Sequence, residues 1–420
     1  MLSQRLTSGE FTENLLETAL ATARLSPADR GLCHELVCGV VRWQATLDCL
    51  IARKTTPGRE PRPALVNLLR LGLYQIFWLD RIPAHAAVHE TVEQAKLSGY
   101  VSQSGFINAI LRAYLREFDE VKKILADMKN SQPALGWSHP EWLVEKWRKH
   151  FGVEKTLELL AWNNTPPKTF ARINTLKTDA VALTQRWRED GVEHDFASRD
   201  WTGENIAFEL KSHPPLNSLG SFRDGWFYVQ DPSTLLAPVL LGAQPGETIL
   251  DLCAAPGGKA TLIAQQMNND GKIVAQDVDQ VRLKLVKDNC SRLGVTNVET
   301  ILPSSFDLQP AIFDRILIDA PCSNTGVMRR RVDLRWRIQS VEIERLRTAQ
   351  SGLLQQAAAK LKPGGVLLYS TCSLEPEENS EVVNAFLEAN PNFKLETERQ
   401  LLPFADGVDG AYVAKLVMAT

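Results

Sequence analysis

Two cysteines stand where predicted strands end, and each is followed by a serine. Cys322 lies in the segment DAPCS after the apolar run FDRILI, and Cys372 lies in STCS after VLLY. A single cysteine is usually core filler, but the carboxyl ends of parallel strands line the ligand crevice of an open α/β sheet. We therefore expect both thiols to reach the same rim of one sheet.

A thiolate at such a rim could activate a pyrimidine ring. Carbon 5 of cytosine is a poor nucleophile, and addition of a thiolate to C6 turns the ring into an enamine-like species that can attack an electrophilic methyl group. A base must then remove the C5 proton so that the thiol can leave. Asp319, close to Cys322 in the sequence, could assist near N3 of the ring if burial raises its pKa.

A loop of small residues lies between a predicted strand and a predicted helix, from Asp251 to Lys259 (DLCAAPGGK). Small residues let the backbone come close to a ligand at the carboxyl end of a sheet. The loop is not GxxxxGK[ST], which disfavours a phosphate cradle of the ATPase kind, and it lacks the full GxGxxG of dinucleotide binding. A plain tight turn is the alternative for any Gly-Gly pair.

Asp277 follows the next predicted strand, which ends at Gln276. A carboxylate at this place can accept hydrogen bonds from a pair of ribose hydroxyls. Capping of the following helix explains the residue equally well. The preceding glycine loop favours nucleoside binding.

The elements around these residues alternate between strands and helices. Strands are predicted at 248–252, 272–276, 298–302, 314–319 and 366–370, and helices at 259–267, 281–293 and 342–361. Such alternation predicts a mostly parallel α/β sheet with helices on both faces. The apolar segment 411–418 could add an antiparallel edge strand.

The first third of the chain is predicted to be all helical. Between Leu65 and Phe77 the apolar side chains follow a three-and-four spacing. Similar stripes run through 11–25, 31–52, 86–97 and 106–118, and together they predict a helical domain over residues 1–130. A connecting segment, 131–240, has helix patterns at 140–151 and 153–162 and strand patterns at 169–174 and 225–229, and the α/β domain covers 241–420.

Length and composition set further bounds. A chain of 420 residues suggests two or three domains. Seven cysteines without a CxxC pair give little support for disulfides or a metal site. The amino terminus lacks the apolar region of a signal peptide, and the apolar stretch 65–79 is too short to span a bilayer, so a soluble cytoplasmic protein is expected.

The net charge of -3 argues neither for nor against nucleic acid, because local clustering matters more. Between Arg329 and Arg347 seven arginines stand against three acidic residues. A phosphate-binding surface would need such a cluster, but charge alone favours a solvated helix face.

Three motifs in this order resemble the NOL1/NOP2/Sun family of RNA cytosine-5 methyltransferases: DLCAAPGGK, DAPCS and STCSLEPEEN. Residues 1–130, with RIPAHAAVHETVEQAK and FINAILR, look like the NusB-like RNA-binding domain of the bacterial 16S rRNA members. The segments ARINTLK and WFYVQDPS are similar to their connecting RNA-binding segment. The resemblance implies a multidomain protein with an all-α NusB-like domain, a small α+β connecting segment and a Rossmann-like class I methyltransferase domain.

The resemblance also implies roles for individual residues. Cys372 would be the nucleophile that attacks C6, Cys322 would assist release of the methylated RNA, and Asp319 would meet the target base. S-adenosylmethionine would be held by Asp277, Asp319 and the loop Cys253, Ala254, Ala255, Pro256, Gly257, Gly258 and Lys259. Arg172, Asn174, Arg329 and Arg330 are expected near RNA.

Several positions depart from the family pattern. Ser304 stands where the family usually has an acidic residue for the adenine amino group, which puts cofactor affinity in doubt. Asn324 replaces a usual glycine, and Arg331-Val332 stand where His-Pro is common, so base positioning could differ.

The resulting expectation is a monomeric enzyme that methylates 16S rRNA and needs neither a metal nor a membrane. The same 5-methylcytosine chemistry on tRNA is an alternative, because the motifs do not name the RNA. A non-catalytic NusB-like RNA-binding module is an alternative of a different class. Both cysteines, the glycine loop and Asp319 speak against that second alternative.

Overall fold

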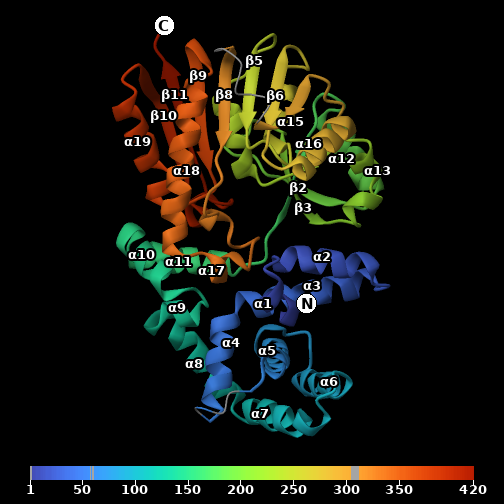
Figure 1. The fold of residues 1–420 in the computed structure, drawn as a ribbon. Helices are drawn as coiled ribbons and strands as arrows, with labels where there is room; N and C mark the ends of the chain where they lie inside the picture. The colour runs from blue at the N-terminus through green and yellow to red at the C-terminus, as the bar shows by residue number, and fades with distance from the viewer. Residues whose placement is uncertain (1, 57, 59–60, 304–311) are drawn as a thin grey trace. The chain divides into compact units, whose positions relative to one another are not determined.

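The computed structural model describes residues 2–56, 58, 61–303 and 312–420, which form two compact units (Figure 1). We call Met1–Thr165 with Met328–Arg337 the helical unit, and Pro166–Val327 with Ile338–Thr420 the sheet unit. A short segment that follows Cys322 in the sequence therefore belongs to the helical unit.

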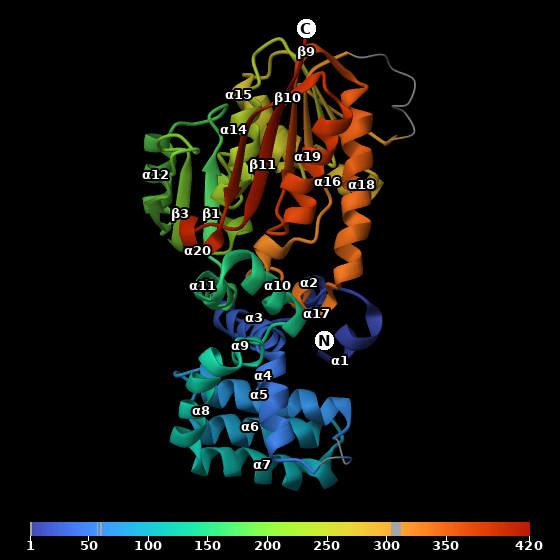
Figure 2. The ribbon, with the colours of Figure 1, turned by 90° about the vertical axis from the view of Figure 1, so that its left-hand side faces the viewer.

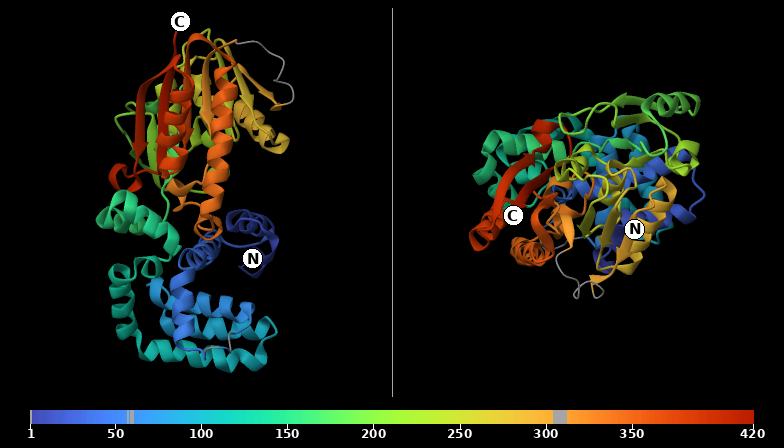
Figure 3. Two further views of the ribbon diagram at one scale, coloured as in Figure 1. Left: turned by 60° about the vertical axis from the view of Figure 1, so that its left-hand side comes forward. Right: turned by 90° about the horizontal axis from the view of Figure 1, so that it is seen from above.

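The helical unit confirms the all-helical prediction for the first third of the chain. Its helices are α1 (Leu2–Ser8), α2 (Thr12–Thr22), α3 (Pro27–Arg42), α4 (Gln44–Arg53), α5 (Pro63–Trp78), α6 (Ala84–Leu97), α7 (Ser104–Arg116), α8 (Phe118–Ser131), α9 (Pro133–Gly136), α10 (Glu141–Phe151), α11 (Val153–Asn163) and α17 (Leu334–Arg337). Figure 3 shows α5 to α7, coloured in light blue and teal, packed against one another. The single stripe predicted over 31–52 is two helices, separated at Trp43.

The segment 328–337 is held in the helical unit by buried arginines. The Arg335 guanidinium is fully buried and donates hydrogen bonds to the carbonyl oxygens of Arg42, Ser138 and Asn163 at 3.0–3.2 Å and to Asn164 Oδ1 at 2.8 Å. These bonds fasten the segment to the ends of α3 and α11. These hydrogen bonds offset part of the cost of burying the cation, although its Nε has no hydrogen-bond partner among the described residues.

The arginine run is therefore not one surface. Arg329 is buried with its guanidinium 4.2 Å from the ring centre of Trp162, whereas the Arg345 side chain, on helix α18 (Ser340–Ala358), is 71% exposed and pairs with Glu342. Neither a continuous solvated face nor a continuous phosphate-binding surface describes this segment. The alternation of buried and exposed arginines depends on contacts with α3 and α11, which local charge does not reveal.

A small antiparallel sheet opens the sheet unit. Its strands are β1 (Thr169–Ile173), β2 (Glu193–Phe196), β3 (Ala207–Ser212) and β4 (Phe227–Val229), in the order β2-β3-β1-β4, and α12 (Ala180–Glu189) packs on it through Trp187. β1 and β4 were predicted, but α12, β2 and β3 were not. β2 is short and largely exposed, so it lacks an apolar pattern.

The main sheet has seven strands in the order β10-β11-β9-β8-β5-β6-β7. The strands are β5 (Thr248–Leu252), β6 (Lys272–Gln276), β7 (Val298–Ile301), β8 (Phe313–Asp319), β9 (Leu361–Thr371), β10 (Phe393–Leu401) and β11 (Ala411–Met418). The pairs from β7 through β9 are parallel, and β11 pairs antiparallel with both β9 and β10. The mostly parallel α/β fold is confirmed.

The prediction that 411–418 is an edge strand is wrong in one respect. β11 lies between β9 and β10, and β10 forms the edge. β11 is mostly buried, as an interior strand requires, whereas most side chains of β10 are exposed. The polar sequence of β10 (FKLETERQL) concealed the edge strand from pattern reasoning.

Helices cover both faces of the main sheet (Figure 2). On one face, α14 (Leu236–Leu241), α15 (Gly258–Gln266) and α16 (Gln280–Leu293) pack on Ile249; on the other, α18 (Ser340–Ala358) and α19 (Ser380–Ala389) pack on Leu250. Successive residues of a strand point to opposite faces, so each strand supplies two cores. The loops after β5, β6, β8 and β9 all leave the sheet at its carboxyl edge.

Replacement of Arg335 by leucine is predicted to destabilise the helical unit by about 2–4 kcal/mol, because it leaves several buried acceptors without donors. Urea unfolding followed by tryptophan fluorescence measures the change. The matched control is Arg345→Leu, whose partner Glu342 is also solvated, and it should alter stability by less than about 0.5 kcal/mol. Equal stability of the two variants would contradict the role given to Arg335.

Candidate functional site

The loop between β5 and α15 is held in a closely turned conformation. Cys253 has φ 61° and Gly257 has φ 100°, both in the left-handed region. The Ala254 N–H donates to the carbonyl of Gln276 at 2.8 Å, which ties the loop to the end of β6. A Cβ at Gly257 would lie 3.2 Å from Val286 of α16, so glycine serves both the turn and the close packing.

Asp277 lies at the end of β6, and its carboxylate accepts a hydrogen bond from the loop between β5 and α15. It is buried and accepts hydrogen bonds from the backbone N–H groups of Ala255 at 3.2 Å and Asp279 at 3.1 Å. Asp279, not Asp277, caps α16, since it accepts from Val281 and Arg282 N–H. The capping alternative for Asp277 is therefore wrong, and its ribose contact stays a prediction.

Asp251 is a candidate cofactor contact that sequence reasoning missed. It is fully buried near the end of β5, and neither carboxylate oxygen has a hydrogen-bond partner among the described residues. Burial raises the pKa of Asp251 well above its usual value, and the charge of Asp319 acts in the same direction. A buried acceptor without a donor fits an incoming cationic or N–H group. The available signal was an acid inside the apolar strand TILDL.

Lys259 and Asp319 form an ion pair at the same rim. The Lys259 Nζ lies 2.6 Å from Asp319 Oδ2, and the Asp319 side chain is 34% exposed. Burial by itself lowers the pKa of Lys259, but the charge and hydrogen bond of Asp319, with smaller effects of Cys372 and Asp251, together outweigh it and the pKa is raised. Lys259 is therefore a cation, and Asp319 offers its other lone pairs to solvent or a ligand.

The two cysteines meet as the sequence predicted. Cys322 is buried and Cys372 half-buried, and their sulfur atoms are 3.4 Å apart. The hydrogen bond with Cys372 raises the pKa of Cys322 well above its usual value, and burial adds to the effect. Cys322 thus holds its proton, whereas Cys372 is the thiol that a substrate can reach.

Cys253 differs from both of these thiols. Burial, followed by the charges of Asp319 and Asp277, raises the pKa of Cys253 to about 12. A thiol with such a pKa has a negligible thiolate fraction at neutral pH, and thiolate is the nucleophilic form. Cys253 belongs to the loop and not to the pair of candidate reactive thiols.

Asn324 and Val332, which differ from the usual family residues, each have defined contacts in the structure. Asn324 has φ 59°, and its Oδ1 accepts a hydrogen bond from the Cys372 thiol at 3.1 Å. Val332 is buried against Leu16 and Val37 in the helical unit. Ser304 lies outside the described residues.

The arginine and asparagine expected near RNA are internal. Arg172 is buried and donates to the Gly258 carbonyl at 3.1 Å and to Thr261 Oγ1 at 3.2 Å. Asn174 is buried and donates to the carbonyls of Gly225 and Leu293. Both side chains have a structural role, because each joins the small sheet to α15 or α16, and their expected contact with RNA stays a prediction. Arg329 is likewise buried.

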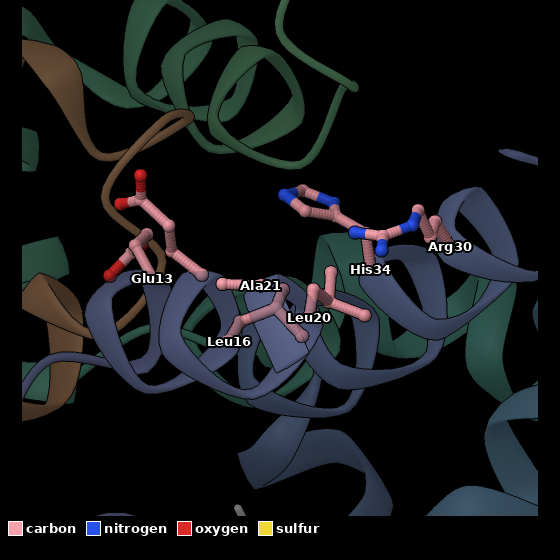
Figure 4. Close-up of a pocket in the computed structure, with 7 residues that line it drawn as sticks. Glu13, Leu16, Leu20, Ala21, Arg30 and His34 are labelled. Atoms are coloured by element: carbon pink, nitrogen blue, oxygen red, sulfur yellow. The ribbon is translucent and has the colours of Figure 1, made fainter. Parts of the chain in front are cut away.

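A hollow elsewhere does not belong to this site. It measures about 460 Å³ and lies between α2 and α3 of the helical unit (Figure 4). Leu16, Leu20, Arg30 and His34 are among its lining residues. The described residues contain no group of three or more side chains suited to a metal ion, and no described helix is long and apolar enough to cross a membrane.

The sheet order, the glycine loop after β5 and the polar rim with two thiols define a methyltransferase with a Rossmann-like catalytic sheet. Comparisons with known proteins agree with this class. Residues 238–417 match the family described as 16S rRNA methyltransferase RsmB/F. Residues 1–116 match the NusB family, and residues 139–200 match the ferredoxin-like domain of RsmF/B-like methyltransferases.

Individual relatives extend the match over the whole chain. The probable ribosomal RNA small subunit methyltransferase B of Synechocystis sp. is 38% identical over 92% of this chain and 87% of its own length. Ribosomal RNA small subunit methyltransferase B of Escherichia coli O1:K1 is 35% identical over 99% and 96%. A solved methyltransferase homolog protein from Pyrococcus horikoshii has a TM-score of 0.59 and 31% identity over 68% of this chain and 97% of that chain.

The chain belongs to the RsmB/RsmF family of rRNA methyltransferases. Its cofactor is S-adenosylmethionine. The site fits this group, because Asp251 supplies buried acceptors without donors and the loop backbone is closely turned beside it. The ammonium and N–H groups of the cofactor are donors of the kind that such acceptors need.

Gly257→Ala is predicted to weaken S-adenosylmethionine binding by roughly tenfold or more, equal to about 1.4 kcal/mol, because the loop must shift to accommodate the new Cβ. Isothermal titration calorimetry measures the affinity. Gly246→Ala is the matched control: Gly246 has φ 82° but open space around its Cβ position. It should lose stability and keep its affinity, and equal affinity in both variants would contradict the prediction.

Proposed function

We propose that the protein transfers a methyl group from S-adenosylmethionine to C5 of a cytosine in 16S rRNA through a covalent adduct between Cys372 and C6. The observation that carries the proposal is the pair of sulfur atoms 3.4 Å apart at the sheet rim. The Lys259–Asp319 ion pair and the glycine loop come from strand ends at the same rim. A partly exposed cysteine beside a buried one suits a reaction in which a sulfur atom must both attack and leave.

The steps follow from the chemistry of cytosine. The Cys372 thiolate adds to C6, and the electrons move to C5, which takes the methyl group that the cofactor supplies. A base then removes the C5 proton, the C5–C6 double bond forms again, and the sulfur leaves. Cys322 holds its proton and lies within hydrogen-bonding distance, so it can donate to the departing Cys372 thiolate.

Asp319 is proposed to meet the target base. Its carboxylate is partly exposed, and Lys259 occupies only one side of it. Carboxylates accept hydrogen bonds from the exocyclic amino group of cytosine. Such a contact would favour cytosine over uracil, which has no donor at that position.

The choice of 16S rRNA rests on relatives, and the same chemistry on tRNA is the alternative. The relatives are named as small subunit rRNA methyltransferases, and the amino-terminal match is to the NusB family. A non-catalytic RNA-binding module is the second alternative, but it gives no reason for two adjacent thiols beside a cofactor loop.

We also propose that the protein is a monomer that acts in the cytoplasm without a metal. Methyl transfer should therefore persist in the presence of EDTA, and in size-exclusion chromatography the activity should elute at the size of a monomer.

The test is incubation of the protein with methyl-labelled S-adenosylmethionine and unmodified 16S rRNA, followed by digestion and mass spectrometry of the nucleosides. Labelled 5-methylcytidine is the expected product. Label only in tRNA, offered in a parallel reaction, would favour the first alternative. Absence of label in any RNA, despite measured cofactor binding, would favour the binding module.

Cys372→Ala is predicted to reduce methyl transfer by at least about a thousandfold, because the variant has no group to add to C6. Its affinity for S-adenosylmethionine should change by less than about twofold, or about 0.4 kcal/mol. Cys33→Ala in the helical unit is the control and should keep full activity. Substantial transfer by Cys372→Ala would remove this residue from the nucleophilic role.

Cys322→Ala is predicted to accumulate a protein–RNA adduct, because the departing Cys372 sulfur loses its hydrogen-bond donor. Denaturing gel electrophoresis detects the adduct as a species of reduced mobility that RNase removes. The double variant Cys322→Ala/Cys372→Ala should show no adduct. An adduct in the double variant, or none in the single one, would contradict the proposed division of labour between the thiols.

A further inference from the structure

A buried carboxylate lies behind the two cysteines and has no role in the steps above. Glu378 is fully buried, in the turn between β9 and α19. It accepts a hydrogen bond from the Ser323 backbone N–H at 2.8 Å and another from its hydroxyl. It also accepts from the Ser373 hydroxyl at 2.5 Å and from Gln350 Nε2 at 3.1 Å.

The two serines are the residues that follow the two cysteines. Ser323 comes directly after Cys322, and Ser373 directly after Cys372. Their hydroxyl oxygens are 3.0 Å apart, and both contact the same oxygen of Glu378. One carboxylate therefore joins two loops whose cysteines are 50 positions apart in the chain.

The surroundings of Glu378 hold it in turn. The Tyr369 hydroxyl donates to the Glu378 carbonyl at 2.7 Å, and the neighbouring Asn379 donates to the Ser373 carbonyl at 2.9 Å. Asn379 also accepts from the Thr371 hydroxyl at 2.6 Å. Hydrogen bonds thus hold both the carboxylate and the backbone carbonyl of Glu378. They also hold both the hydroxyl and the backbone carbonyl of Ser373.

Glu378 is buried, and the described residues form no ion pair with it. The hydrogen-bond donors that the described residues direct to its carboxylate are all neutral. Burial raises the pKa of Glu378, and the donors from Ser323, Ser373 and Gln350 oppose that effect. A carboxylate in such a place is costly to bury, and an apolar residue of similar volume would fill the space at lower cost. What an apolar residue cannot do is hold two serines at one point.

We propose that Glu378 is a positioning residue that sets the distance and orientation of the Cys322 and Cys372 thiols by anchoring Ser323 and Ser373. The expected effect on methyl transfer rests on the proposed function, whereas the effect on the spacing of the two thiols does not. Glu378 does not touch the reacting atoms. Its negative charge also acts on Cys322, where it helps to keep the thiol protonated.

Glu378→Gln tests the anchor with little change of volume. A glutamine amide offers one acceptor oxygen and an NH₂ group, so it cannot accept from all of the donors that now converge on the carboxylate. The matched control is Glu381→Gln on the next turn, because the Glu381 side chain is 49% exposed. Ser373→Ala is a milder second variant, which removes one of the bonds and keeps the carboxylate.

Thiol spacing can be measured without RNA or methyl transfer. Diamide oxidises two adjacent thiols to a disulfide and is itself reduced to the hydrazine by their two hydrogens. The disulfide between Cys322 and Cys372 is quantified by mass spectrometry of the linked peptides. We expect Glu378→Gln to form it at least about fivefold more slowly than the wild type, Ser373→Ala to lie between the two, and Glu381→Gln to match the wild type.

Methyl transfer provides the second measurement. For Glu378→Gln we expect kcat to fall about 10- to 100-fold, while KM for S-adenosylmethionine stays within about twofold, since the hydrogen bonds that the described residues make to the carboxylate do not come from the loop between β5 and α15. A Glu378→Gln protein with wild-type diamide and methyl-transfer rates would overturn the proposal. If this variant does not fold, Ser373→Ala decides the outcome by the same two rates.

The two measurements distinguish failure of the covalent mechanism from failure of the positioning role of Glu378. Activity in Cys372→Ala would overturn the covalent mechanism, yet the diamide rate would still test whether Glu378 sets the thiol spacing. Normal diamide rates with impaired transfer in Glu378→Gln would overturn the positioning role and leave the covalent mechanism standing.

Discussion

Parallel pairing of β8 with β5 and with β9 is the constraint on which the candidate site depends. In this register Ile318 lies beside Leu252, and Asp319 lies beside Ser370. The loops that follow these strands must therefore leave the sheet at one edge, within a few ångströms of each other. Thiols that are 50 positions apart in the chain meet at 3.4 Å because of this register. A shift by one residue would reverse the face of every side chain in the strand.

Buried charge is the second organising feature of the protein. Arg335 in the helical unit and Glu378 in the sheet unit are each fully buried, and each is held by neutral hydrogen-bond partners from distant parts of the chain. Arg172 follows the same pattern between the small sheet and α15. Removing an ion from water is unfavourable, and hydrogen bonds to the buried ion offset part of that cost. Such residues therefore require the correct arrangement of several loops at once, and they favour one geometry over near alternatives.

Pattern reasoning succeeded where a local signal was strong and failed where it was weak. Apolar runs bounded by turns located β5 and β6 to the residue, because buried parallel strands are short and continuously apolar. β10 escaped because an exposed edge strand has no such run, and β11 was placed at the edge in its stead. The helix α12 and the strands β2 and β3 escaped for a similar reason, since β2 and half of β3 are polar or exposed.

For the site, the sequence by itself determined which groups could do chemistry: two thiols at strand ends, a loop of small residues, and Asp319. Motif and periodicity are local properties, and they also settle which elements carry these groups. Only the tertiary structure decided which polar side chains are internal. It placed Arg172, Asn174 and Arg329 inside the protein, tied Asp277 to the loop between β5 and α15, and gathered Ser323 and Ser373 around Glu378. Burial and hydrogen-bond partnership are set by residues far away in the chain, so no local pattern can encode them.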